Sequence, residues 1–220
     1  MRKKAGIAAI ERIQEGMLIG LGTGLTVSHF IDQLIQRVAE GLQIQVVASS
    51  MQSLRQAKMG GIPLADINTI TSIDITIDGA NEINPQKQMI KGGGGALLRE
   101  KILANISREL IIIVDESKLV EKLGKYPLPI EIVPFGKEAI IDKIKMLGFH
   151  GQIRTHEKNG PFETDNGNFI YDIYFDSLRE DPESDHEKLI HIPGVLETGF
   201  FFNLVHTVFV GKSDGTVCVI

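Results

Sequence analysis

The sequence predicts an α/β fold with a mostly parallel sheet, followed by a smaller α+β unit. Short apolar segments alternate with amphipathic ones over the first part of the chain, as strands and helices do around a parallel sheet. The segment 110–114 is continuously apolar, which is typical of a strand buried on both faces. Beyond it, Pro127, Pro129 and Pro134 punctuate the chain and the pattern changes, which indicates a second unit.

The elements of the first part follow from the spacing of apolar residues. An opening helix is expected at 3–14, where isoleucines recur at helical spacing. A strand, a glycine loop and a helix follow within 17–40. The remaining elements are a strand at 43–50, a helix at 53–60, a short extended piece at 62–67, a strand at 72–80, a loop and helix at 92–106, and a strand at 109–117.

The second unit is expected to contain a helix, two strands and another helix. Their predicted ranges are 138–149, 152–157, 168–175 and a stretch around 186–192. The final segment, 206–220, has the pattern of a hairpin that returns to the first sheet. We therefore place one domain at 1–128 plus 204–220 and a smaller one at 129–203.

Composition narrows the classes of partner. The chain has 220 residues, 43% of them hydrophobic, and a formal net charge of -5, so nothing attracts it generally to nucleic acid or to an anionic membrane. A small-molecule partner is expected. Cys218 is the only cysteine, and no apolar run is long enough to cross a bilayer. These features favour a cytoplasmic protein that binds no membrane.

The first candidate site is the glycine loop at 20–26, between a strand and a helix. Glycines let a backbone approach a phosphate, and a helix start offers unpaired N–H groups. Thr23, Gly24, Leu25 and Thr26 would bind this anion. A dinucleotide fingerprint is disfavoured because Leu25 stands where its third glycine belongs. A tight turn without a ligand is the alternative.

The second candidate is Asp78-Gly79-Ala80-Asn81, directly after an expected strand. In an open parallel sheet, the carboxyl ends of strands face the ligand crevice. Asp78 would then point into a site, although a carboxylate that caps the next turn explains the same residue equally well.

The third candidate is the lysine-glycine segment from Lys91 through Gly92, Gly93 and Gly94 to Glu100. Four consecutive glycines at 92–95 contribute nothing to a core, so the alternative to a site is a flexible linker. A lysine before the glycines and a helix after them favour an oxyanion site made of backbone N–H groups and an ammonium. Lys118 follows the expected strand at 109–117. In an alternating topology the four polar segments converge on the same edge of one sheet, namely 20–26, 78–81, 91–100 and the segment that ends at Lys118.

Metal chemistry is not expected from this sequence. Its six histidines lack the spacing of metal ligands, and one cysteine cannot form a thiolate cluster. His29 and His206 have apolar neighbours in sequence, which favours two core histidines.

In this order, the segments IGLGTGLTVSHFID, IDGANEI, MIKGGGGALLREKI and VDESKLVEKLGKYPLPIEIVPF resemble those of the type A ribose-5-phosphate isomerase family. TDNGN and IPGVLETGFFFN, later in the chain, are also similar to family segments. The resemblance implies a Rossmann-like domain closed by the C-terminal strand, an inserted ferredoxin-like domain and a homodimer. It also implies aldose-ketose isomerisation of ribose 5-phosphate and ribulose 5-phosphate through an enediolate, in the pentose phosphate pathway, without a cofactor.

Residue roles carried by the resemblance agree with the chemistry. A carbon acid beside a carbonyl needs a base over the carbon and positive charge or N–H donors at the oxygen. Glu100 matches the family's general base, Lys91 the lysine that stabilises the enediolate oxygen, and Asp78 the aspartate that assists ring opening. Lys118 and the loop 23–26 match substrate-binding positions.

Two positions depart from the family pattern. Asn81 stands where the family usually has aspartate, and Leu25 where it usually has serine. Asn81 cannot ionise, so slower ring opening is our hypothesis, and the hydroxyl missing at Leu25 leads us to expect weaker substrate binding.

Two rival functions use the same features. A sugar-phosphate sensor would bind in the same crevice without needing a base at Glu100. A coenzyme A transferase-like enzyme would instead use a carboxylate as a nucleophile that forms a thioester.

Overall fold

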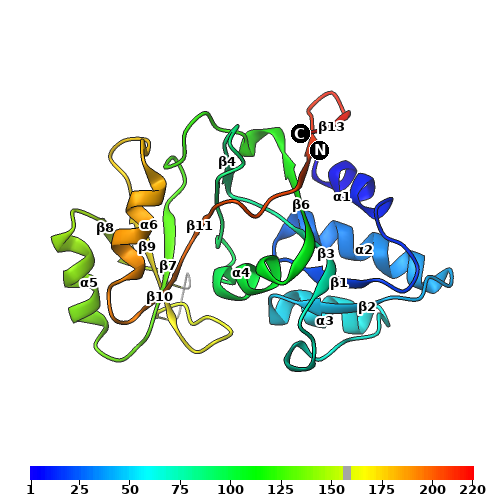
Figure 1. Ribbon diagram of the computed structural model, residues 1–220, viewed down its shortest axis with the longest axis horizontal. Coiled ribbons are helices and arrows are strands. Elements are labelled where there is room, and N and C mark those ends of the chain that lie inside the picture. Colours follow the sequence, from blue (N-terminus) through cyan, green and yellow to red (C-terminus); the bar gives the residue numbers. More distant parts are fainter. Residues whose placement is uncertain (156–159) are drawn as a thin grey trace. The chain divides into compact units, whose positions relative to one another are not determined.

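The computed structural model describes residues 1–155 and 160–220, which divide into two compact units (Figure 1). The first unit comprises residues 1–80, 99–118 and 204–220, and the second comprises 81–98 and 119–203. Among the described residues, none of the helices is both long and apolar enough to span a membrane.

A six-stranded sheet forms the centre of the first unit, with the strand order β13-β12-β6-β3-β1-β2. All neighbouring strands are parallel except β12 and β13, which form the antiparallel hairpin expected at the C-terminal end. The strands are β1 (Leu18–Leu21), β2 (Gln45–Ala48), β3 (Ile73–Asp78), β6 (Ser107–Asp115), β12 (Thr207–Gly211) and β13 (Val217–Val219).

Helices cover the sheet through apolar stripes. The helices are α1 (Arg2–Ile10), α2 (Leu25–Ala39), α3 (Met51–Met59) and α4 (Leu97–Asn105), with short 3-10 turns η1 (Ile67–Thr69) and η2 (Glu116–Lys118). Val27, Phe30, Ile31 and Leu34 of α2 are buried in a core shared with α1, β1 and β3. Leu103 of α4 packs with Val47 and Ile73 in a separate cluster. The opening helix ends at Ile10, earlier than its predicted limit of residue 14.

In the second unit, a β-α-β-β-α-β order builds an antiparallel sheet with the strand order β10-β7-β9-β8, the ferredoxin-like arrangement. Its elements are β7 (Leu128–Ile132), α5 (Lys137–Met146), β8 (His150–Ile153), β9 (Phe169–Tyr174), α6 (Pro182–Ile190) and β10 (Val195–Thr198). Isoleucines of β7 and α5 fill its core. The predicted strand at 152–157 overlaps β8, although residues 156 and 157 lie outside the described residues.

The predicted fold class is confirmed: a mostly parallel sheet with its C-terminal hairpin, and a smaller antiparallel unit. The unit boundaries differ from the predicted ones, because residues 81–98 and 119–128 belong to the second unit. A small sheet explains the first difference: β4 (Glu82–Ile83) and β5 (Met89–Ile90) pair with each other and β5 with β11 (Phe200–Phe201). Strands of two residues carry no alternation that a sequence pattern can reveal.

The interpretation of His29 and His206 as core residues is wrong, because both are exposed. The apolar neighbours of His29 form the buried face of α2, whereas His206 lies in the bend that precedes β12.

Candidate active site

In the first unit, hydrogen bonds to neighbouring segments fix the loop between β1 and α2. The Gly22 N–H donates to the Ile77 carbonyl at 2.9 Å, and the Ser53 hydroxyl donates to the Gly22 carbonyl at 2.6 Å. The Thr23 and Ser49 hydroxyls lie 2.8 Å apart. The loop is thereby held at the carboxyl ends of β1 and β3.

The first turn of α2 follows this loop directly. The helical hydrogen-bond pattern begins with the Ser28 N–H, which donates to the Gly24 carbonyl at 2.9 Å. The amides of Leu25 and Thr26 come before this pattern. Amides in the first turn of a helix carry the positive end of the helix dipole. Leu25 is 67% exposed, so its side chain contributes little to packing. Such a helix start can bind an anion, and binding at this loop stays a prediction.

Asp78 is the last residue of β3 and is almost fully buried. Its Oδ1 accepts hydrogen bonds from the Gly79 N–H at 2.7 Å and the Thr23 N–H at 3.2 Å. A Cβ added to Gly22 would lie 2.0 Å from the same oxygen, so only glycine lets the loop pass this carboxylate. Asp78 therefore does cap the turn, and it also joins the loop between β1 and α2 to the end of β3.

Another carboxylate shapes the turn that carries Lys118. Asp115, at the end of β6, accepts hydrogen bonds from the Ser117 hydroxyl, from the Ser117 N–H at 3.1 Å and from Arg2 Nε at 2.8 Å. Burial raises the pKa of Asp115, but the Ser117 and Arg2 hydrogen bonds outweigh it and hold the pKa below its usual value. The ionised carboxylate thus fixes η2, which ends at Lys118.

Glu100 lies in the first turn of α4 and is 4% exposed. A carboxylate this deeply buried is not a surface group. Carboxylates in the first turn are also favoured by the helix dipole.

In the second unit, Lys91 is equally buried, at 3% exposure. Its Nζ lies 5.3 Å from the centre of the Phe201 ring, an arrangement in which the ring offsets part of the cost of burying an ammonium. The Lys91 N–H donates to the Gly199 carbonyl at 2.8 Å, which anchors the start of the glycine segment.

The segment 91–95, called the glycine loop from here on, has a defined turn rather than the conformation of a linker. Gly92 has φ +98° and Gly95 has φ +77°, values that favour glycine, and the Gly95 N–H donates to the Gly92 carbonyl at 2.9 Å. The Gly93 N–H donates to Asn81 Oδ1 at 2.9 Å. One amide that we expected to face an oxyanion is therefore bonded to Asn81 instead.

Three residues around the glycine loop were not found from the sequence. Arg154 donates to two of the loop's carbonyls, and the Tyr126 hydroxyl would lie 2.9 Å from a Cβ on Gly93. Glu82 is buried and accepts hydrogen bonds from the Gly124 and Tyr126 N–H groups at 2.8 and 2.6 Å. Burial raises the pKa of the Tyr126 phenol above its usual value.

The predicted site residues divide between the two units. The first unit brings Thr23 and Asp78 into contact and carries Gly24, Leu25, Thr26, Gly79, Ala80, Glu100 and Lys118. The second brings Asn81 and Gly93 into contact and carries Lys91, Gly92 and Gly94.

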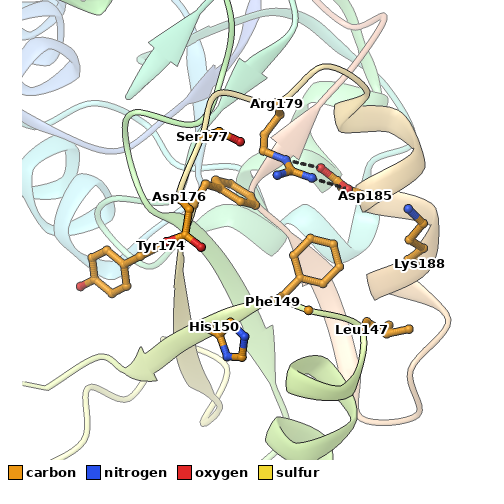
Figure 2. A pocket seen from close by; sticks show the side chains of 11 residues that line it. Leu147, Phe149, His150, Tyr174, Asp176, Ser177, Arg179, Asp185 and Lys188 are labelled. Carbon is orange, nitrogen blue, oxygen red and sulfur yellow. Dashed lines mark hydrogen bonds and ion pairs between the residues drawn. The ribbon is translucent and has the colours of Figure 1, made fainter.

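None of these residues lines the pocket of the second unit shown in Figure 2. That pocket is lined by Phe149, His150, Tyr174, Lys188 and their neighbours, with Arg179 and Asp185 paired at its side (Figure 2).

Fold and loops together define a class: two-unit α/β proteins in which polar residues gather at the carboxyl ends of parallel strands, beside a helix start suited to a phosphate. A family model described as ribose 5-phosphate isomerase A (phosphoriboisomerase A) matches residues 45–215. The chain therefore belongs to the ribose 5-phosphate isomerase A family.

Curated relatives match over almost the whole chain. A ribose-5-phosphate isomerase A of Protochlamydia amoebophila is 48% identical over 219 residues, which cover 100% of this chain and 94% of that protein. One of Listeria innocua is 47% identical, covering 100% of this chain and 97% of the relative.

Solved structures share the fold. Ribose 5-phosphate isomerase A of Methanocaldococcus jannaschii has a TM-score of 0.93 and 36% identity, covering 100% of this chain and 97% of that one. A D-ribose-5-phosphate isomerase in complex with phospho-erythronic acid has a TM-score of 0.94 and 38% identity, covering 100% of this chain and 96% of that one.

Proposed function

We propose that this protein interconverts D-ribose 5-phosphate and D-ribulose 5-phosphate through an enediolate, without a metal or organic cofactor. Family membership over the full chain is the observation that carries the proposal. The related structure with phospho-erythronic acid supports it further, because that ligand is a phosphorylated sugar acid whose carboxylate resembles the paired oxygens of an enediolate.

Glu100 is the general base in this proposal. Its carboxylate removes the proton from C2 of open-chain ribose 5-phosphate and returns it to C1, while O2 gives up its hydroxyl proton and O1 gains one, so that an aldehyde becomes a ketone with no net redox change. Burial of Glu100 supports this role, because a buried carboxylate is held in one place, as a general base must be.

Lys91 stabilises the enediolate oxygen as negative charge develops there. A buried ammonium is worth more at a developing oxyanion than an exposed one, since little water screens it. Asp78 assists ring opening by moving a proton between sugar oxygens. Its bonds to the Thr23 and Gly79 amides hold the carboxylate in one place for that step.

The phosphate binds at the loop 23–26 and at Lys118, while Gly79, Ala80, Asn81 and residues 92–94 contact the sugar. Binding energy from a phosphate far from the reacting carbons keeps the sugar in register. We further propose that the protein acts as a cytoplasmic homodimer in the pentose phosphate pathway, and light scattering coupled to size exclusion tests the dimer.

The test is formation of ribulose 5-phosphate from ribose 5-phosphate in EDTA, followed directly or with a coupling enzyme. Wild type should turn over without metal, and Glu100→Gln should lose about 100- to 10,000-fold in kcat, the usual contribution of a general base. Glu131→Gln is a matched control, because Glu131 is also a buried carboxylate but binds Thr164, Asn166 and Asn168.

Exchange of substrate hydrogen separates the chemistry from binding. In heavy water the wild type should place deuterium on the sugar, and Glu100→Gln should not, while Glu131→Gln should behave as wild type. Metal-free wild type that binds ribose 5-phosphate without turnover would favour the sensor instead. Turnover that survives in Glu100→Gln would remove Glu100 from the role of base.

Whether Lys91 and Glu100 act on one substrate is tested by a double variant. If both act in one step, Lys91→Met combined with Glu100→Gln should lose less than the product of the two single losses, because groups that act as a unit are not additive. Independent effects would multiply and would contradict a shared step.

A further inference from the structure

Arg154 directly follows β8, and its guanidinium contacts the glycine loop within the second unit. Its Nη1 donates to the Gly92 and Gly93 carbonyls, each at 3.0 Å. Its other edge is bound by Asp172 of β9, with Nε to Oδ2 at 2.8 Å and Nη2 to Oδ1 at 2.6 Å. Both side chains are mostly buried, at 15% and 13% exposure.

A guanidinium is suited to this double contact. It is planar, always charged, and presents its N–H donors in a fixed fork, so the bidentate bond to Asp172 also sets the direction of Nη1. Lysine has one rotatable ammonium and cannot hold Asp172 and two carbonyls in the same geometry. Asp172 also supplies the negative charge that a buried guanidinium needs.

Fixing a carbonyl fixes the amide on the other side of the same peptide unit. A trans peptide is planar, with its N–H pointing away from its C=O. The unit between Gly92 and Gly93 is held at both ends, with its carbonyl on Arg154 and its N–H on Asn81 Oδ1. In the next unit, the bond from Arg154 to the Gly93 carbonyl directs the Gly94 N–H away from Arg154, at an exposed position.

Phe162 adds a second contact between Arg154 and the loop. The guanidinium carbon lies 5.7 Å from the centre of the Phe162 ring, and the Phe162 N–H donates to the Arg154 carbonyl at 2.8 Å. The same ring covers Gly95, where an added Cβ would lie 2.3 Å from Phe162 Cε1. The loop is thus held by Asn81, Arg154 and Phe162, and four glycines would otherwise have the largest conformational freedom of any sequence.

We infer that Arg154, oriented by Asp172, is a positioning residue for isomerisation: it holds the glycine loop in the conformation in which Lys91 and the Gly94 N–H meet the enediolate oxygen. This inference rests on the proposed function for the reaction, and on the hydrogen bonds above for the geometry. Arg154 itself touches no reacting atom in this scheme.

Arg179 provides a matched control in the same unit. It also forms a bidentate pair, with Nε to Asp185 Oδ2 at 2.6 Å and Nη2 to Oδ1 at 3.0 Å (Figure 2). Its guanidinium carbon lies 4.7 Å from the centre of the Phe175 ring. Its guanidinium binds α6 rather than the glycine loop. Both Arg154→Lys and Arg179→Lys therefore remove a bidentate guanidinium, but only Arg154→Lys removes one that contacts the glycine loop.

The experiment compares kinetics and amide hydrogen exchange in the two variants. Arg154→Lys should lose about 10- to 100-fold in kcat, as small misplacements of a catalytic group do, with KM changed by less than about threefold. Peptides covering 91–95 should exchange faster. Arg179→Lys should keep kcat and KM within about twofold of wild type and leave exchange of the loop unchanged.

Each failure has its own signature. Wild type without turnover would end the proposed function, while the exchange measurement would still decide whether Arg154 holds the loop. Active wild type with equal kcat in the two variants would overturn the inference, as would a loss of kcat without faster exchange at 91–95. If Arg154→Lys does not fold, Asp172→Asn against Asp185→Asn repeats the comparison, with the same outcomes expected.

Discussion

Replacing Gly22 with alanine should lower kcat far more than a steric clash of similar size at Gly20, in the strand that precedes it. The added Cβ would lie 2.0 Å from Asp78 Oδ1 and 2.1 Å from Asp78 Cγ. To reach an ordinary contact near 3.4 Å, the carboxylate or the loop must shift by about 1.4 Å. That shift breaks the bond from the Thr23 N–H to Asp78, which is already long at 3.2 Å.

The magnitude follows from the role proposed for Asp78. Displacement of a catalytic group by about 1 Å can cost about 100-fold in rate, so kcat of Gly22→Ala should fall by about that factor. Overpacking a buried site also costs about 1 to 3 kcal/mol of stability. A loss of activity alone would therefore be ambiguous, and stability must be measured beside it.

Gly20→Ala resolves that ambiguity. Gly20 lies in β1, and its added Cβ would meet Thr76 Oγ1 at 1.9 Å, a clash of similar size against a hydroxyl that is bonded to Ser107. Both variants should lose similar stability in thermal unfolding followed by circular dichroism, but only Gly22→Ala should lose most of its kcat. Equal losses of kcat in the two, or a Gly22→Ala enzyme with nearly normal kcat, would refute the role of Asp78.

Three further predictions concern single residues. Asn81→Asp should raise kcat, because a carboxylate oxygen can still accept from the Gly93 N–H while restoring an ionisable group; unchanged kcat would refute our hypothesis of slow ring opening. Leu25→Ser should lower KM for ribose 5-phosphate by adding a hydroxyl at the exposed start of α2, and a KM that does not fall would count against it. Asp115→Asn should unfold more easily than wild type near neutral pH. Hydrogen bonds from Ser117 and Arg2 lower the pKa of Asp115 in the folded protein. The stability that its ionised carboxylate contributes is therefore present above the pKa of the unfolded state and is lost as the pH falls through the pKa of the folded state. The difference in melting temperature should therefore shrink below about pH 4, and a difference that is constant with pH would contradict the assignment.

Local patterns in the sequence were enough to predict most of the fold. The apolar stripe of α2 has the period of a helix, and the continuous apolar run of β6 is typical of a strand buried on both faces. Both patterns can be recognised without any knowledge of neighbouring elements. Asp78 was likewise placed at a strand end by its position alone. The roles proposed for Glu100 and Lys91 came from the family resemblance and stay predictions.

Contacts between distant segments could not be predicted in this way. Arg154 reaches the carbonyl of Gly92, 62 residues earlier in the chain, and nothing near Arg154 in the sequence marks it as a partner of that loop. The bond between Asn81 and the Gly93 N–H is similar, because it depends on a turn that brings two short strands together. Such contacts arise only when the second unit has folded, so the supports of a site are harder to predict than its reactive groups.

The chain crosses between its two units at 80/81, 98/99, 118/119 and 203/204. Each of the first three crossings falls within two residues of a proposed site residue, namely Asn81, Glu100 and Lys118. Inserting or deleting a residue at any of these joints would change the spacing between a reactive group and the rest of its unit. Length variation in related proteins is therefore expected in surface turns such as the one after α5, and neither unit can be cut out as one continuous gene fragment.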